Sequence, residues 1–418
     1  MKRIKLGDVL DVRRGASLSG DYYAEDGTFV RLTLGNFNYP NGGFKENTSK
    51  TDIYYTGPAR KEFILKKGDI ITPLTEQVAG LLGETATIPE DNRYIQCGDI
   101  GLIIPDNTKL SRRFAYYLVS SPAVKKQLGA AAQQTKIRHT SPDSIKACEA
   151  WIPEQVQEQE KIAAILDNIN AAISNNTAIC SDLEALAKLL YDYWFVQFDF
   201  PDENGKPYKT SGGKMVWNEE LKREIPEEWN TTKIGNVCQV LLGGTPDTNN
   251  PEYWNGEIPW LNSGEVAVSP VLFAEKTITE KGMNESATSF AKAGAVVMSI
   301  TRYIRPSILG IDSCFNQSVV AVLPTDKYRT AYLYPVMKAN VPMYMSLRTG
   351  AQQPHINKET VENTIIICPT DDVLNRYNQI VDPLYTEQIN TAKETAQLQE
   401  LRDFLLPMLM NGQVKIKE

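Results

Sequence analysis

The sequence contains the same domain twice, and the second copy begins about halfway along the 418-residue chain. Three segments of the first half return in the second half: residues 5–15 as 233–243, residues 66–75 as 292–301, and residues 129–137 as 349–356. The spacing shrinks slightly from the first pair to the third, as small insertions and deletions in loops would cause. Because the repeat is as long as a whole domain, it is not a short solenoid period. The chain is therefore expected to fold as two related domains.

Each copy is followed by a stretch with the apolar spacing of a coiled coil. After the first copy, steps of three and four residues alternate along the seam of such a helix. The members of this run are Ile162, Ile165, Ile169, Ala172, Asn176, Ile179, Leu183, Leu186, Leu190 and Tyr193. A similar run from Val373 to Met408 follows the second copy, and its centre at residues 387–394 is polar. We expect an antiparallel pair with Asn176 near that centre; the alternative is that each helix packs only on its own domain.

The predicted fold is α+β, with two strand-rich repeated domains separated by two long antiparallel coiled-coil helices. The predicted divisions are a first domain at 1–152, a first helix at 153–198, a linker at 199–228, a second domain at 229–369, a second helix at 370–412 and a tail at 413–418. Short β-branched runs such as 69–71 and 294–297 predict strands. Short helices are expected near 111–128 and 328–346.

Charge is distributed unevenly along a chain whose net charge is -7. Residues 1–150 carry 21 Lys and Arg against 17 Asp and Glu, and residues 229–368 carry 11 against 11. The first helical segment, 151–198, carries only 2 against 7. The acidic excess therefore lies outside the repeated domains, each of which can still present a basic face to a polyanion.

Cysteine usage and hydropathy indicate a cytoplasmic protein. The six cysteines lie far apart and form neither a C-x-x-C pair nor the cluster of a disulfide framework. The basic start is followed by a hydrophilic stretch, where a signal peptide would need an apolar one. No segment approaches the roughly 18 apolar residues of a membrane span. We expect reduced thiols and no membrane association.

Common catalytic motifs are absent from the sequence. It has no phosphate-binding loop and no G-x-G-x-x-G, and its two histidines are too few for a histidine-rich metal site. The tetrapeptide at 250–253 resembles the N-P-P-[YF] motif of amino-methyltransferases, but a glutamate replaces the second proline, which favours a turn. Residues 201–222 resemble a nuclease metal site, but the polar, glycine-rich segment between the acids favours a hairpin. We expect no catalytic residue, metal or cofactor in this chain; a methyltransferase or nuclease built on these motifs is the alternative.

Matching places in the two copies carry basic, amide and aromatic side chains. Arg, Gln and Asn pair with guanine and adenine edges, and Lys suits phosphate. The candidate DNA-binding residues are Arg13, Arg14, Gln77, Gln133, Gln134, Lys136, Arg138 and His139 in the first copy, and Thr245, Asn249, Arg302, Tyr303, Arg305, Gln352, Gln353, His355 and Asn357 in the second. A shared framework that presents different side chains is typical of two readers of different sequences. The alternatives are ordinary solvated surface, or a scaffold that clamps two identical partners without DNA.

Several segments resemble the specificity subunit of Type I restriction-modification systems. They are IPEQVQEQEKIAAILDNINAAI at 152–173, LLYDYWFVQFDFPDENGKPYKTSGGKMVWNEELKREIPEEW at 189–229, GGTPDTNNPEYWNGEIPWLNSGE at 243–265, GAQQPHINKE at 350–359 and LLPMLMNG at 405–412. The resemblance covers nearly the whole chain. It implies two target-recognition domains, each of which reads one half of a bipartite site in double-stranded DNA.

The resemblance also implies partner proteins. Two methyltransferase subunits would dock on the long helices and bring S-adenosylmethionine for adenine-N6 methylation. Restriction subunits would bring ATP and magnesium for translocation and cleavage, so this chain itself would bind none of these cofactors. A helix of 35 to 40 residues is about 55 Å long, and equivalent major-groove faces recur about every 34 to 36 Å. The helices can therefore act as a ruler between the two half-sites.

Overall fold

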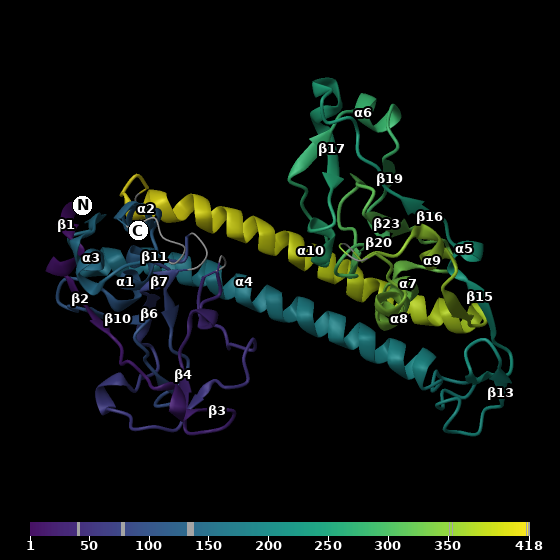
Figure 1. Ribbon diagram of the computed structural model, residues 1–418, viewed down its shortest axis with the longest axis horizontal. Helices are drawn as coiled ribbons and strands as arrows, with labels where there is room; N and C mark the ends of the chain where they lie inside the picture. Colours follow the sequence, from purple (N-terminus) through teal and green to yellow (C-terminus); the bar gives the residue numbers. More distant parts are fainter. Residues whose placement is uncertain are drawn as a thin grey trace. The chain divides into compact units, whose positions relative to one another are not determined.

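The computed structural model describes residues 1–39, 42–76, 80–131, 138–350, 352, 354–414 and 416. The chain divides into two compact units. Unit 1 consists of Met1–Ile173 and Leu398–Glu418, and unit 2 consists of Ser174–Gln397. Each unit holds one copy of the repeated domain and a part of each long helix, α4 (Val156–Tyr191) and α10 (Asp371–Met410) (Figure 1).

Unit 1 is built on two four-stranded sheets, with strand orders β2-β10-β6-β8 and β3-β5-β4-β9. Its strands are β1 (Lys2–Lys5), β2 (Leu10–Arg14), β3 (Tyr23–Ala24), β4 (Phe29–Arg31), β5 (Tyr54–Tyr55), β6 (Ile70–Pro73), β7 (Thr75–Glu76), β8 (Ala86–Thr87), β9 (Tyr94–Ile95), β10 (Ile100–Pro105), β11 (Arg138–His139) and β12 (Glu149–Ile152). Its short helices are α1 (Arg112–Val119), α2 (Pro122–Ala131) and α3 (Pro142–Ala147). The strand pair β1-β12 closes the domain by joining its first and last strands.

Unit 2 repeats this plan, with strand orders β16-β23-β20-β21 and β18-β17-β22-β19. Its strands are β13 (Met215–Asn218), β14 (Arg223–Pro226), β15 (Asn230–Lys233), β16 (Val240–Leu242), β17 (Trp254–Leu261), β18 (Lys276–Ile278), β19 (Ser289–Ala291), β20 (Val296–Ser299), β21 (Pro306–Ile308), β22 (Ser313–Phe315), β23 (Val319–Val322) and β24 (Ile365–Cys368). Its short helices are α5 (Ile234–Val237), α6 (Glu280–Asn284), α7 (Thr330–Ala339), α8 (Val341–Ser346) and α9 (Lys358–Glu362). The hairpin β13-β14 lies in the predicted linker.

The topology confirms the duplication read from the sequence. The pair β15-β24 of unit 2 corresponds to β1-β12 of unit 1, and β16-β23-β20 corresponds to β2-β10-β6. In each copy the second sheet contains one parallel pair, β4-β9 or β17-β22, among antiparallel neighbours. The helices expected near 111–128 and 328–346 are present, each divided into two: α1 and α2, and α7 and α8.

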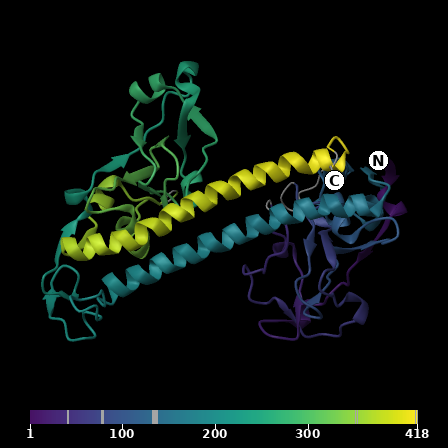
Figure 2. The same ribbon diagram turned by 180° about the vertical axis from the view of Figure 1, so that it is seen from behind.

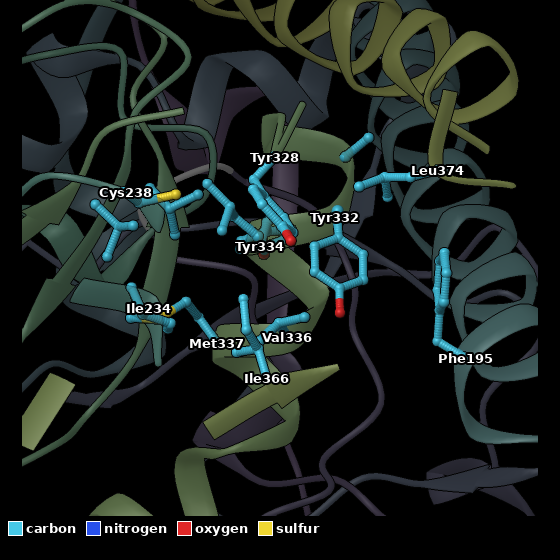
Figure 3. Close-up of a cluster of buried hydrophobic side chains, with 14 of the residues drawn as sticks. Phe195, Ile234, Cys238, Tyr328, Tyr332, Tyr334, Val336, Met337, Ile366 and Leu374 are labelled. Carbon is cyan, nitrogen blue, oxygen red and sulfur yellow. The ribbon is translucent and has the colours of Figure 1, made fainter. Parts of the chain in front are cut away.

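The core of unit 2 is aromatic and includes both long helices. Tyr332 of α7 is buried beside Phe195, which lies in the π-helical turn Asp192–Val196 directly after α4, and the two rings make an edge-to-face contact with centroids 5.0 Å apart (Figure 3). Leu374 of α10 is fully buried in the same cluster. Edge-to-face pairs favour one fixed arrangement of rings, beyond the general benefit of burial. The domain of unit 2 is therefore packed directly on the helix pair.

A matching ion pair fastens the domain of each unit to the helix that follows it. In unit 1, Arg113 of α1 donates from Nε to Asp167 Oδ2 at 2.6 Å. In unit 2, Arg329 at the start of α7 donates from Nη1 to Asp382 Oδ2 at 3.1 Å. Each aspartate lies 11 residues after the first residue of its helix, Val156 or Asp371. The duplication thus extends to the way each domain meets its helix.

The long helices are antiparallel within each unit (Figure 1, Figure 2). In unit 2, Asn176 Nδ2 donates to Glu394 Oε2 at 3.1 Å, which confirms the expected position of Asn176 near the polar centre of α10. Farther along, Gln388 Nε2 donates to the Cys180 carbonyl at 3.3 Å. In unit 1, Leu166 and Leu409 share one core cluster. No helix in the described part of the chain is both long and apolar enough to cross a membrane.

The buried seam matches the predicted one at Ile162, Ile169, Val373 and Tyr377, which are buried, and departs from it by one residue in the middle of the helix pair. Ala187 of α4 and Gln388 of α10 are buried, whereas the predicted seam residues Leu186 and Glu387, one position earlier, are exposed. The exposed members of the predicted runs include Ile179, Leu186, Ile380 and Leu401. The helices contact each other partly through small and polar side chains, which an apolar pattern does not reveal. Large apolar residues on the neighbouring stripe are left facing outward.

This shift predicts opposite outcomes for two leucines of unit 1. Leu166→Ala should lower the free energy of unfolding by about 2–5 kcal/mol, because it opens a cavity in a sealed core. Leu401→Ala should change it by roughly 0.5 kcal/mol or less, because the side chain is already exposed. Urea unfolding followed by circular dichroism measures both. Equal losses for the two variants would show that Leu401 belongs to the buried seam.

Candidate nucleic-acid interface

In unit 2, several candidate residues meet at one end of the sheet β16-β23-β20. Because both outer strands run antiparallel to β23, the ends of β16 and β20 lie beside the start of β23. The chain leaving β20 passes the turn before β23, where Ile300 N donates to the Ser318 carbonyl at 2.9 Å. The chain leaving β16 contacts the same turn, with Thr245 Oγ1 2.5 Å from Gln317 Oε1. Residues 243–245 and 300–305 therefore flank a single surface.

The loop 300–305 presents three of the candidates to solvent. Ile300 and Ile304 are buried in the core and anchor the loop at two points. Between and beyond them, Arg302, Tyr303 and Arg305 are exposed. The Arg305 guanidinium carbon lies 5.6 Å from the centre of the Tyr303 ring, within the range of a cation–π contact.

A second segment, residues 348–357, braces this loop. Arg302 N donates to the Pro354 carbonyl at 3.1 Å, and Ile356 N donates to the Ile300 carbonyl at 3.0 Å. Arg348 Nη1 donates to the Arg302 carbonyl at 2.8 Å. Arg302 has φ of 57°, a left-handed conformation that a non-glycine residue adopts only when its surroundings hold it there. The structure thus places the segment that contains Gln352 and His355 beside the loop that carries Arg302, although the two are distant in sequence.

Unit 1 has the same construction at the matching end of β2-β10-β6. After β6, Thr75 and Glu76 pair with His139 and Arg138, and Thr140 N donates to the Leu74 carbonyl at 2.8 Å. This bond corresponds to that from Ile356 to Ile300, so His139 and His355 occupy equivalent positions. The sequence alignment that matches Gln133-Gln134 with Gln352-Gln353 differs from this structural correspondence, because it matches His355 with Lys136 and not with His139. Both histidines are exposed.

A glycine at the same place in each copy allows this construction. A Cβ on Gly15 would lie 2.2 Å from the Cys97 carbonyl oxygen, and one on Gly243 would lie 2.2 Å from the Phe315 carbonyl oxygen. Neither position can accept a side chain, because the chain passes too close to the neighbouring backbone. These two glycines belong to the first repeated segment of the sequence, so the repeat encodes the close approach.

Several predicted DNA-binding side chains form hydrogen bonds or ion pairs within the protein. In unit 1, Arg138 Nε is 2.8 Å from the buried Glu76 carboxylate, which also accepts from Leu82 N at 2.9 Å. Arg13 Nη2 donates to the Glu62 carbonyl at 2.5 Å, and Arg14 Nε donates to the Gly98 carbonyl at 2.7 Å. Arg13 is partly covered, whereas Arg14 is exposed.

In unit 2, two of the predicted amides stabilise local turns. Asn357 caps α9, where its Oδ1 accepts from Thr360 N at 2.8 Å. Asn249 Nδ2 donates to Asp247 Oδ1 at 3.2 Å. Gln77, Gln133, Gln134, Lys136 and Gln353 lie outside the described residues. For all the candidates, contact with DNA stays a prediction.

The loop 300–305 of unit 2 is basic, which favours an anion. It contains Arg302 and Arg305 and no Asp or Glu, and Arg348 contacts the Arg302 carbonyl. Sequence reasoning missed Arg348, because the bond that brings it to Arg302 joins residues 46 positions apart. The nearest signal was that Arg348 immediately precedes the repeated segment 349–356.

The described residues offer little for catalysis. No group of three or more His, Cys, Asp or Glu side chains among them is arranged to hold a metal ion. Burial raises the pKa of Cys97 and Cys314 to about 11 and that of Cys238 to about 12, so these thiols remain protonated near neutral pH. The two motifs that resemble enzyme sites form turns: Asn250 Oδ1 accepts from Glu252 N, and Asp202 Oδ1 accepts from Asn204 N.

Comparison with known proteins finds a matching family model and two related proteins. Residues 1–185 and 226–400 match the family model described as Type I restriction modification DNA specificity domain. The specificity subunit of the type I restriction enzyme MjaIX from Methanocaldococcus jannaschii is 24% identical over 324 residues, which cover 76% of this chain and 72% of that protein. The HindI specificity subunit of Haemophilus influenzae is 21% identical, covering 85% of this chain and 89% of the relative.

A solved structure shows the same fold. The crystal structure of the S subunit of a Type I restriction-modification system from M. genitalium aligns with a TM-score of 0.62 at 15% identity. The alignment covers 98% of this chain and 96% of that one. Two strand-rich domains with two long helices are therefore an architecture already seen in a solved protein.

Because Arg138 pairs with the buried carboxylate of Glu76, its substitution tests whether Arg138 stabilises the fold or is available to bind DNA. Arg138→Met should lower the free energy of unfolding by about 3 kcal/mol, because it leaves a charged group buried without its partner. The double variant Glu76→Gln/Arg138→Met should recover part of that loss, because the neutral amide needs no counter-ion. Arg14→Met is the matched control at the same sheet end and should stay within about 0.5 kcal/mol of the unaltered protein. If Arg138→Met is as stable as Arg14→Met, Arg138 is available for DNA.

Proposed function

This chain belongs to the Type I restriction-modification DNA specificity subunits, which are not catalytic, and from that premise we propose that its two domains read the two halves of a bipartite DNA site. The recognition domains are residues 1–152 and 229–369. The observation that carries the proposal is that equivalent sheet ends, each shaped by Gly15 or Gly243, expose different side chains. A common framework sets where a reader stands on DNA, and the varying side chains set which bases it accepts.

The two readers differ in charge and in shape. In unit 1 the residue opposite Arg138 is the buried Glu76, whereas Arg302 occupies the equivalent position in unit 2 and is exposed. Unit 2 adds Tyr303 and Arg305 to the same loop. Arginines in this setting bind guanine edges or phosphate groups. Two half-sites of different sequence are the expected result.

The outward-facing residues of the helices support the docking of two methyltransferase subunits. Leu186 and Leu189 of α4 are 44% and 62% exposed, and Leu401 and Phe404 of α10 are 44% and 63% exposed. Within each pair the residues are three apart, so they lie on one helical face. Leu186 follows Val156 by 30 residues, and Leu401 follows Asp371 by 30 residues. Two apolar surfaces at equivalent places suit two copies of one partner better than two unrelated proteins.

The long helices also set the distance between the half-sites, in this proposal. Their lengths are fixed by their residue counts, since each residue adds about 1.5 Å to an α-helix. The methyltransferase subunits supply S-adenosylmethionine and carry out adenine-N6 methylation. Restriction subunits with ATP and magnesium add translocation and cleavage where they are present.

Sequencing of N6-methyladenine tests the function. The chain is expressed with its methyltransferase subunit, and the methylated positions are read across the genome. A bipartite motif with an unread spacer should appear only when both proteins are present. If a confirmed complex with an active partner methylates no motif, the chain is a scaffold and not a reader of DNA.

The same measurement tests the ruler. Residues 174–180 of α4 and 388–394 of α10 are deleted together, since Asn176 pairs with Glu394 and Cys180 with Gln388 across the two segments. The deletion removes about 10 Å of helix, or one heptad, and keeps the apolar stripes in phase. Both half-sites should persist with a shorter spacer. A change in the half-sites themselves would show that the helices do more than set the distance.

The paired apolar surfaces predict the stoichiometry of the complex. Leu189→Glu or Phe404→Glu should each reduce the assembly from two methyltransferase subunits to one, because a charge would be buried at one of two docking sites. The double variant should bind none. Ser181→Glu adds the same charge on another exposed face of α4 and should leave two subunits bound. Mass photometry reads the three species directly, and a full complex with the double variant would place the docking sites elsewhere.

A further inference from the structure

The most exposed tyrosine among the described residues, Tyr303, stands at the sheet end that we assign to DNA in unit 2. Its side chain is 66% exposed. An aromatic ring left in water forgoes the gain of burial, so an exposed one at a binding surface suggests contact with a partner. Arg302 directly precedes it, Arg305 follows two residues later, and the loop 300–305 carries no acid. The partner that fits an aromatic ring between two cations is a nucleobase between phosphates.

Its loop is built to keep the ring outside. The next residue, Ile304, is buried in the core, as is Ile300 on the other side. Backbone bonds from Arg302 N to Pro354 and from Ile356 N to Ile300 tie the loop to its neighbour, and Arg348 holds the Arg302 carbonyl. Two buried anchors and these backbone bonds thus fix the loop while the ring of Tyr303 stays exposed. A rigid, projecting aromatic residue has the form of the side chains that proteins insert between base pairs.

The proposed reaction requires such a residue. The N6 atom of adenine lies in the base pair and inside the stack, so the base must leave the duplex before a methyltransferase can act on it. Extrusion costs the stacking of that base and leaves a gap. A side chain that fills the gap offsets part of this cost and lengthens the life of the extruded state.

We propose that Tyr303 inserts into the half-site read by unit 2 and fills the space left by the extruded target adenine. This inference rests on the proposed function of the chain. Tyr303 acts on the substrate by positioning it, and the methyl transfer itself takes place in the partner subunit. Arg302 and Arg305 hold the phosphates on each side, and Arg348 keeps the turn in shape. The role is distinct from base reading, since a ring in the stack accepts any neighbouring base.

The test uses the complete complex with its methyltransferase subunit and a duplex that carries its bipartite site. The target adenine of one half-site at a time is replaced by 2-aminopurine, whose fluorescence rises when it leaves the stack. The unaltered complex should give a rise at both half-sites. Tyr303→Ala should reduce the rise roughly tenfold at one half-site and leave the other unchanged. Tyr303→Trp, which keeps a stacking ring, should restore it.

A mispaired substrate separates insertion from a merely structural role. When the target adenine is mispaired, extrusion costs less, so Tyr303→Ala should methylate that half-site at close to the normal rate. Phe273→Ala is the matched control, because it removes another aromatic ring of unit 2 that is 73% exposed, and should leave both half-sites unchanged.

Three results would overturn the proposal. They are a full fluorescence rise with Tyr303→Ala, an equal loss at both half-sites, and a loss that the mispair does not relieve. The last two would show that Tyr303 acts in folding or in binding as a whole. Failure of the proposed function looks different, because the unaltered complex would then methylate no bipartite motif.

Discussion

The attachment of each domain to the helix that follows it is the constraint on which the rest of the structure depends. In unit 1 the Arg113–Asp167 ion pair lies beside a core in which Leu166 is sealed. In unit 2 the Arg329–Asp382 pair accompanies the burial of Leu374 and Tyr377 of α10 in the core of the domain. Exposed ion pairs contribute little stability by themselves, so the buried contacts hold the domain and the ion pair orients it. A reader fixed to its helix in this way cannot turn independently of it.

The sequence predicts the architecture well. The duplication is visible when the two halves of the sequence are compared, and the helical period is visible within each helical segment. It predicts the buried seam of the helices less well. The apolar pattern chose Leu186 instead of Ala187 because leucine is larger, and chose Glu387 instead of Gln388 because Glu387 continues the three-and-four spacing. In the structure the smaller Ala187 and the amide Gln388 are buried. The large apolar residues beside the seam are exposed, and in the proposed function they form the docking surfaces for the methyltransferase subunits. One pattern had to serve two interfaces, and periodicity alone could not separate them.

The sequence identified segments that the structure brings together, but not the contacts that their side chains make within the protein. The repeated segments identified the chain after β6 and β20, and the structure brings that chain to the sheet ends with the segments carrying Arg138 and His355. It could not be foreseen that Arg138 neutralises a buried Glu76, or that Asn357 caps a helix. Both roles depend on neighbours distant in sequence or on the end of a short helix. Arg348 escaped notice for the same reason, since its contact with Arg302 joins two separate loops.

The two buried anchors of the loop in unit 2 have an evolutionary consequence. Ile300 and Ile304 supply its contacts with the core, whereas Arg302, Tyr303 and Arg305 project away from it. Mutations at the projecting positions therefore alter what the surface binds with little effect on whether the chain folds. The way in which this surface holds a partner can change by single substitutions in such a loop, without a second change to restore stability. Such substitutions change the binding of the surface and not the stability of the fold, so selection acts directly on binding.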